Sequence, residues 1–266
     1  MPTKKTDLIF ITGRQRSGTT VFRLLLENHG AYNADEIFHG VLSRKDRFYE
    51  YLYQRVLEDK NLIFPAHHQR IFNDYIGFLR LQSAGRPIAM DVKYNNYNLL
   101  TPPHKLMKSE SFIIDYMQAS KAPVIHIERK NKLRIYISQL IAQKTGIWGI
   151  GKKENIPSGR LGITVDLKNM QQELKNITHA TEIARKKLSK LEHVYEISYE
   201  TMFDSEGNFS TDIMQIVRDV LAIQQVNPKP AHVKINSEPL TEIIANYAAV
   251  ARVLAGTDYE WMLENR

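Results

Sequence analysis

The sequence contains no cysteine, which excludes disulfide bonds and thiolate metal ligands. It also lacks any run of about 20 apolar residues, the length that a membrane-spanning helix needs, so we expect no membrane span. The first seven residues have no apolar core of the kind found in secretory signals. These absences together favour a cytoplasmic protein.

What the sequence does have is the composition of a folded, basic protein. Hydrophobic residues make up 43% of the 266 residues, which favours a packed core over disorder. The formal net charge is +7, which suits an anionic ligand or a membrane surface, although a solvated basic surface is the better explanation of net charge alone. The length and composition fit one domain over residues 1–266.

A glycine loop between an apolar run and a helix is the most informative stretch. Residues 8–11 (LIFI) predict a buried strand, residues 13–20 read GRQRSGTT, and apolar residues from Val21 onward predict a helix. This layout points backbone N–H groups and a helix N-terminus at an anion. The Walker A pattern G-x-x-x-x-G-K-[ST] has lysine where this chain has Thr19, and here the positive charge lies inside the loop, on Arg14 and Arg16.

A second basic turn follows another predicted strand. Residues 123–128 (PVIHIE) predict the strand, Arg129 and Lys130 lie in the turn, and Ser138 lies in the helix that follows. Because strands and helices alternate, we expect an α/β fold with a parallel sheet flanked by helices. Ligands of such sheets bind beyond the carboxyl ends of the strands, so both basic turns should face one crevice. That arrangement suits a ligand with two separated anionic groups.

The other elements are predicted from the spacing of apolar residues. Helices are expected over residues 44–59, 67–81, 106–119, 165–190, 209–223 and 240–254, and strands over 87–93 and 193–197. Lys93 ends a predicted strand and is expected to be solvated, with a reach into the site as the alternative. Residues 145–164 are glycine-rich and long for a connection, which indicates a lid or substrate loop.

Residues 29–40 are rich in acidic and imidazole groups. Glu36, Asp35 or His39 could remove a proton from an attacking hydroxyl. A polar turn in which Asp35 caps the next helix explains the same residues.

Together these features resemble the sulfotransferases that use 3′-phosphoadenosine 5′-phosphosulfate (PAPS). Residues 13–20 look like that family's 5′-phosphosulfate loop, with Arg16 as the basic residue before Ser-Gly-Thr-Thr. Residues 128–138 look like its 3′-phosphate motif, with Lys132 where the family often has proline, and either Arg129 or Lys130 is left to hold the phosphate. Residues 238–257 resemble the end of bacterial Stf-type members, including the trehalose sulfotransferases.

The resemblance implies a P-loop-containing nucleotide hydrolase-like (sulfotransferase) fold, PAPS as donor and 3′-phosphoadenosine 5′-phosphate (PAP) as product, with no metal ion. The acceptor would be a hydroxyl of a carbohydrate, glycolipid or other small metabolite. Glu36 stands where related bacterial enzymes are thought to place the base, with Asp35 and His39 as rivals. Arg16 would stabilise charge on the leaving phosphate. The residues implied to bind the donor are Arg14, Gln15, Arg16, Ser17, Gly18, Thr19, Thr20, Arg129, Lys130 and Ser138.

Two other classes of function are weighed against this reading. A P-loop kinase or nucleotide hydrolase with a degenerate Walker A loop would need Mg²⁺ near Thr19 or Thr20 and a lysine from elsewhere in the chain. A nucleic-acid partner is disfavoured, because the basic residues are spread along the chain without an aromatic-interleaved run. Peripheral membrane contact and a homodimer stay open.

Overall fold

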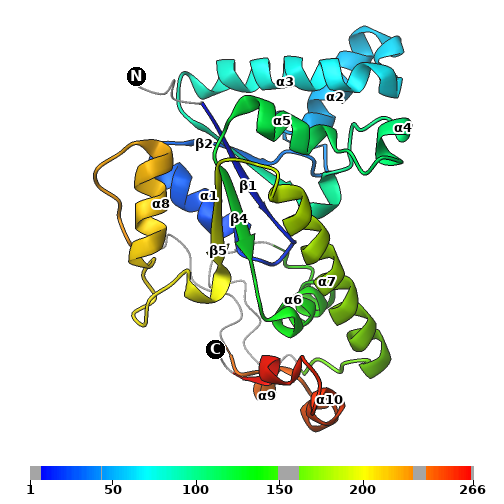
Figure 1. Cartoon of the computed structure of the whole chain (residues 1–266), viewed down its shortest axis with the longest axis vertical. Coiled ribbons are helices and arrows are strands. Elements are labelled where there is room, and N and C mark those ends of the chain that lie inside the picture. Colours follow the sequence, from blue (N-terminus) through cyan, green and yellow to red (C-terminus); the bar gives the residue numbers. More distant parts are fainter. Residues whose placement is uncertain (1–6, 43, 149–161, 230–237, 265–266) are drawn as a thin grey trace.

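The computed structural model describes residues 7–42, 44–148, 162–229 and 238–264. At its centre lies a five-stranded parallel sheet with the strand order β2-β3-β1-β4-β5 (Figure 1). The predicted α/β fold with a helix-flanked parallel sheet and a strand–glycine loop–helix unit is therefore confirmed. The strands are β1 Leu8–Gly13, β2 Tyr32–Glu36, β3 Ile88–Lys93, β4 Val124–Glu128 and β5 Val194–Ser198.

Helices connect and cover these strands. Asparagine, serine and aspartate side chains cap several of them; the Asn131 side chain, for example, accepts the N–H of Arg134 and so begins α6. The helices are α1 Thr19–Asn28, α2 Phe48–Glu58, α3 His68–Ser83, α4 Pro103–Leu106, α5 Phe112–Ser120, α6 Lys132–Thr145, α7 Leu167–Leu188, α8 Thr211–Leu221, α9 Leu240–Ile243 and α10 Tyr247–Leu254.

The sheet separates two apolar layers. On one face, Ile11 and Ile127 pack in a cluster with residues of α1 and α8. On the other face, Phe10 and Val92 pack in a cluster with residues of α3 and α5. Both faces are covered, and for this reason the central strands read as nearly continuous apolar runs.

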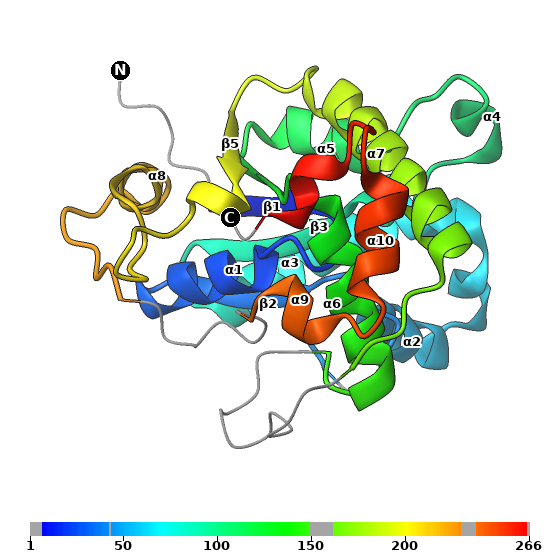
Figure 2. The ribbon, with the colours of Figure 1, turned by 90° about the horizontal axis from the view of Figure 1, so that it is seen from below.

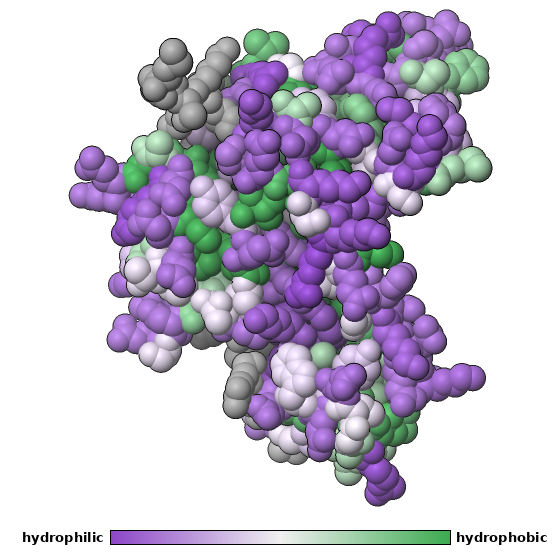
Figure 3. Space-filling view, in the orientation of Figure 1, coloured by the Kyte–Doolittle hydropathy of each residue, from purple (hydrophilic) through white to green (hydrophobic). Residues whose placement is uncertain are grey.

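A third apolar cluster lies beyond the carboxyl ends of the strands. It joins α6, α7, α9 and α10, which Figures 1 and 2 show gathered at that end of the sheet. The surface on the face shown in Figure 3 is mostly hydrophilic, with apolar residues in scattered patches. Among the described residues, no helix combines the length and the apolar character that crossing a membrane requires.

Two predicted helices were wrong in their extent. The predicted helix over 240–254 is two helices, because Ile244 forms a parallel bridge with Ile163 and the Asn246 side chain bonds the backbone N–H and C=O of Val165, both at 2.9 Å. The predicted helix over 106–119 begins only at Phe112, where the Ser111 side chain caps α5. In both places, polar contacts with the backbone determine where the helix begins or ends, although the spacing of apolar residues predicts a longer helix.

Strand β2 was missed, because its sequence YNADE has no apolar alternation. It lies at the edge of the sheet beside β3, and its register shifts between Asn33 and Glu36. Asp35 has a positive φ of 63° at this irregularity. Such irregularities redirect side chains, so this one sets where Asp35 and Glu36 point. The interpretation of Asp35 as a helix cap is wrong.

Candidate functional site

The glycine loop joins the end of β1 to the start of α1, and packing explains both of its glycines. A Cβ on Gly13 would lie 2.5 Å from the carbonyl oxygen of Ile127. Gly18 has a φ of +98°, and its Cβ would lie 2.5 Å from the ring of Tyr199. Arg16, between them, has a φ of 70°, a conformation that few non-glycine residues adopt. The backbone is thus held in a strained, close-packed form at the position of a predicted anion-binding residue.

The two predicted basic turns meet in one place. The Nε and Nη2 atoms of Arg16 donate to the Oγ of Ser138 at 2.9 and 2.8 Å. Its Nη1 donates to the carbonyl oxygen of Trp148 at 2.5 Å. The guanidinium therefore bridges the glycine loop and α6, across 122 residues of sequence.

The structure separates the two cations that the sequence left as alternatives in the second turn. Arg129 is only 8% exposed, and its guanidinium lies over the ring of Tyr199, 4.6 Å from the ring centroid. Burial lowers the pKa of Arg129, while the neighbouring Tyr199 and Glu200 act in the opposite direction. The Lys130 side chain is exposed. The Nζ of Lys132 donates to Glu128 at 2.6 Å and to the carbonyl oxygen of Arg129 at 3.0 Å.

Lys93 is buried rather than solvated, so the expectation for it was wrong. Its side chain is 4% exposed, and its Nζ lies 2.7 Å from the Oδ2 of Asp91 and 3.3 Å from the Oε1 of Glu36. The same Nζ donates to the hydroxyl of Thr19. Alternate residues of a strand share a face, so Asp91 and Lys93 enter the same space beside the glycine loop. A lysine from β3 thus contacts the residue that occupies the Walker lysine position.

The three candidate bases have different surroundings. Asp35 is bound by Arg23, Arg44 and Arg47, with the nearest nitrogens at 2.6–3.0 Å. Burial by itself would raise the pKa of Asp35, but the three guanidinium groups outweigh it and lower this pKa to about 2. A carboxylate held in this way is a weak base.

The two rivals of Asp35 have different partners. The Nδ1 of His39 lies 3.1 Å from both the N–H of Val41 and the Nη1 of Arg47. Glu36 keeps 23% of its side chain exposed and contacts Lys93. Of the three, Glu36 is therefore the carboxylate beside the glycine loop with access to solvent.

The remaining loop residues differ in burial. Arg14 is half-buried and lies 3.9 Å from Glu173 of α7, and burial lowers its pKa, partly offset by Glu173 and Tyr94. Gln15 is exposed, and the hydroxyl of Ser17 donates to the carbonyl oxygen of Arg14 at 2.6 Å. Thr19 is buried and Thr20 is half-buried.

Sequence reasoning missed Tyr199 and Glu200, which follow β5. The Tyr199 ring touches the glycine loop and stacks on Arg129, and Glu200 accepts backbone N–H groups from the second turn. The rule that ligands bind beyond the carboxyl ends of parallel strands could have found them, since residues 193–197 were predicted as a strand. The predicted lid over 145–164 falls mainly on residues 149–161, which lie outside the described residues.

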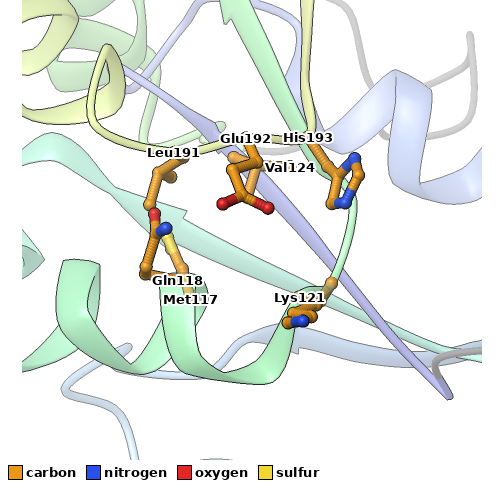
Figure 4. Close-up of a pocket in the computed structure, with 8 residues that line it drawn as sticks. Met117, Gln118, Lys121, Val124, Leu191, Glu192 and His193 are labelled. Carbon is orange, nitrogen blue, oxygen red and sulfur yellow. The ribbon is translucent and has the colours of Figure 1, made fainter.

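A shallow hollow lies at the amino ends of β4 and β5 and is separate from this site. It has a volume of only about 10 Å³ and is lined by side chains that include Lys121, Glu192 and His193 (Figure 4). These residues precede β4 and β5, whereas the glycine loop follows the carboxyl end of β1. The candidate site residues predicted from the sequence lie at the other end of the strands, beyond their carboxyl ends.

Comparison with known proteins yields similarities of structure only. No family model and no curated protein matches the chain. A shikimate kinase from Bacteroides thetaiotaomicron has 9% identity and a TM-score of 0.43, over 81% of this chain and 98% of the kinase. The sulfotransferase domain of the Synechococcus PCC 7002 olefin synthase has 15% identity and a TM-score of 0.43, over 97% of this chain and 90% of that domain. A shikimate kinase from Acinetobacter baumannii, in complex with shikimate, has 13% identity and a TM-score of 0.34, over 81% of this chain and 93% of the kinase.

Proposed function

We propose that this protein transfers a sulfuryl group from PAPS to a hydroxyl of a carbohydrate, glycolipid or other small metabolite. The observation that carries the proposal is the contact between Arg16 and Ser138, which joins the glycine loop to the helix that follows the second basic turn. PAPS carries anionic groups at two separated positions, the 5′-phosphosulfate and the 3′-phosphate. A nucleoside triphosphate carries its negative charge on a single chain of phosphates. It would have no second anionic group for the turn at Arg129.

The site supplies a role for each group in an in-line transfer. The Glu36 carboxylate takes the proton of the acceptor hydroxyl as its oxygen bonds to sulfur. The bond between sulfur and the bridging phosphate oxygen breaks, and PAP leaves. Arg16, Lys93 and the N–H groups of the glycine loop stabilise the charge that grows on the departing phosphate. In this proposal, Arg129 holds the 3′-phosphate.

A thermal-shift assay tests donor binding directly. At a PAP concentration 100 times the dissociation constant, binding to the native state adds about 2.7 kcal/mol of stability. For a chain of this size we expect a rise in melting temperature of roughly 5 °C or more, without added magnesium. Adenosine 5′-phosphate, which lacks the 3′-phosphate, should give a smaller rise at equal concentration. No rise with millimolar PAP would contradict the proposed function.

Removing the hydroxyl that joins the two turns should affect donor binding more than turnover. We expect Ser138→Ala to raise the KM for PAPS and the Kd for PAP about 10-fold, because Arg16 loses the acceptor of two of its hydrogen bonds. Isothermal titration with PAP measures the effect. Gln143→Ala, on the exposed side of the same helix, is the control and should bind PAP as the wild type does. A Ser138→Ala protein with wild-type affinity would show that Ser138 has no part in the donor site.

A P-loop kinase is the second candidate, and one observation favours it. The Lys93 amine beside Thr19 is the lysine from elsewhere in the chain that a kinase with this loop would need. Stabilisation by ATP that requires Mg²⁺, together with no stabilisation by PAP, would support the kinase. Magnesium-independent stabilisation by PAP would favour the sulfotransferase.

A further inference from the structure

A single 3₁₀ turn after β5, Tyr199–Thr201, touches both of the turns that form the donor site. The ring of Tyr199 lies against Gly18 of the glycine loop and under the guanidinium of Arg129. The next residue, Glu200, contacts the backbone of the second turn. No proposed chemical step uses Glu200, so its contact with the second turn calls for another role.

Both carboxylate oxygens of Glu200 accept backbone N–H groups. Oε1 accepts the N–H of Asn131 at 2.9 Å, and Oε2 accepts the N–H of Lys130 at 3.1 Å. Oε2 also accepts the hydroxyl of Ser198 at 2.8 Å. These N–H groups lie immediately before the first residue of α6, Lys132, where the helix dipole favours a negative charge. Bonds from N–H groups to an ionised carboxylate are stronger than neutral ones, so the turn is held firmly.

This contact determines how an anion can bind at the second turn. The backbone N–H groups of Lys130 and Asn131 point at Glu200, so these two donors are not available to an incoming phosphate. Arg129 is the buried one of the pair Arg129 and Lys130, and it directly precedes the two residues that Glu200 holds. Tyr199 supports the Arg129 guanidinium from one side while Glu200 secures the backbone that carries it.

We propose that Glu200 is a positioning residue that holds the second turn so that Arg129 faces the 3′-phosphate of the donor. This inference rests on the proposed function, because it assigns the 3′-phosphate to Arg129. Glu200 acts only through the turn and does not itself touch the donor. Its removal should therefore reduce the preference for ligands that carry a 3′-phosphate and leave the rest of the nucleotide bound as before.

Binding of two ligands, PAP and adenosine 5′-phosphate, distinguishes a positioning role of Glu200 from a general role in stabilising the fold. We expect Glu200→Ala to weaken PAP binding about 10-fold, as is typical when a group that orients a binding residue is lost. The Kd for adenosine 5′-phosphate should change less than about twofold, because this ligand has no 3′-phosphate. Glu200→Gln keeps one acceptor oxygen and should show a smaller loss, and it serves if the alanine variant does not fold. Glu192→Ala, an exposed residue at the other end of β5, is the matched control.

A double-mutant cycle tests whether Glu200 acts through Arg129. In an Arg129→Ala background, Glu200→Gln should change the Kd for PAP less than about twofold, because the residue that it positions is gone. Equal losses in both backgrounds, or equal losses for PAP and adenosine 5′-phosphate, would overturn the positioning role. If both Glu200 variants bound PAP with wild-type affinity, the positioning role would be wrong and the proposed function would be unaffected. If the wild-type protein did not bind PAP, the proposed function would be wrong as well.

Discussion

Replacing Lys93 with methionine is expected to lower the free energy of unfolding by about 3–5 kcal/mol. The Lys93 amine lies 2.7 Å from Asp91, whose side chain is fully buried. The next cation near Asp91, Arg23, lies 3.9 Å away and is already bound to Asp35 at 2.6 Å. Methionine keeps the length of the side chain, so the loss comes from a buried carboxylate left without its partner. Urea unfolding followed by circular dichroism measures the change.

The control for Lys93 is a double variant that removes both charges. Asp91→Asn combined with Lys93→Met should recover much of the stability, because neither buried charge is then left unpaired. If Lys93 also stabilises the leaving phosphate, the double variant should stay poorly active although it is stable. A Lys93→Met protein within about 1 kcal/mol of the wild type would show that the buried pair contributes little.

Replacing Glu36 with glutamine is expected to lower kcat about 10²–10⁴-fold, the usual contribution of a general base. Glutamine has nearly the same shape but cannot take the proton of the acceptor hydroxyl. The Kd for PAP should change much less than kcat, because Glu36 contacts Lys93 but, among the described residues, makes no hydrogen bond or ion pair with Arg16 or Arg129. Screening radiolabelled PAPS against glycan, lipid and phenol acceptors supplies the substrate for the measurement.

The matched control for Glu36 is Glu27→Gln, on the exposed side of α1. Glu27 accepts a hydrogen bond from Asn33 and, among the described residues, makes no hydrogen bond or ion pair with a candidate site residue. Its turnover should equal that of the wild type. If Glu36→Gln itself turned over at a near-wild-type rate, Glu36 would not be the base. His39 would then be the next candidate, since the pKa of about 2 makes Asp35 a weak base.

Local signals in the sequence were enough for the central elements. The apolar run before Gly13 and the one before Arg129 were read as strands, and both are strands of the parallel sheet. Strand β2 has only Ala34 as an apolar residue in its interior, so its pairing with β3 comes from the sheet and not from its own pattern. The break at Ile244 likewise depends on Ile163, some 80 residues away.

The sequence by itself determined the glycine loop, the second basic turn and the parallel sheet that carries them. These features follow from local patterns in the sequence: the positions of glycines, the spacing of apolar residues and the residues that cap helices. Only the tertiary structure decided that Arg16 bonds Ser138, that Lys93 is buried beside Thr19, and that Glu200 holds the turn next to Arg129. The physical reason is that the burial and pairing of a charged side chain depend on which distant strand lies beside it. A local pattern of residues cannot predict which distant strand that will be.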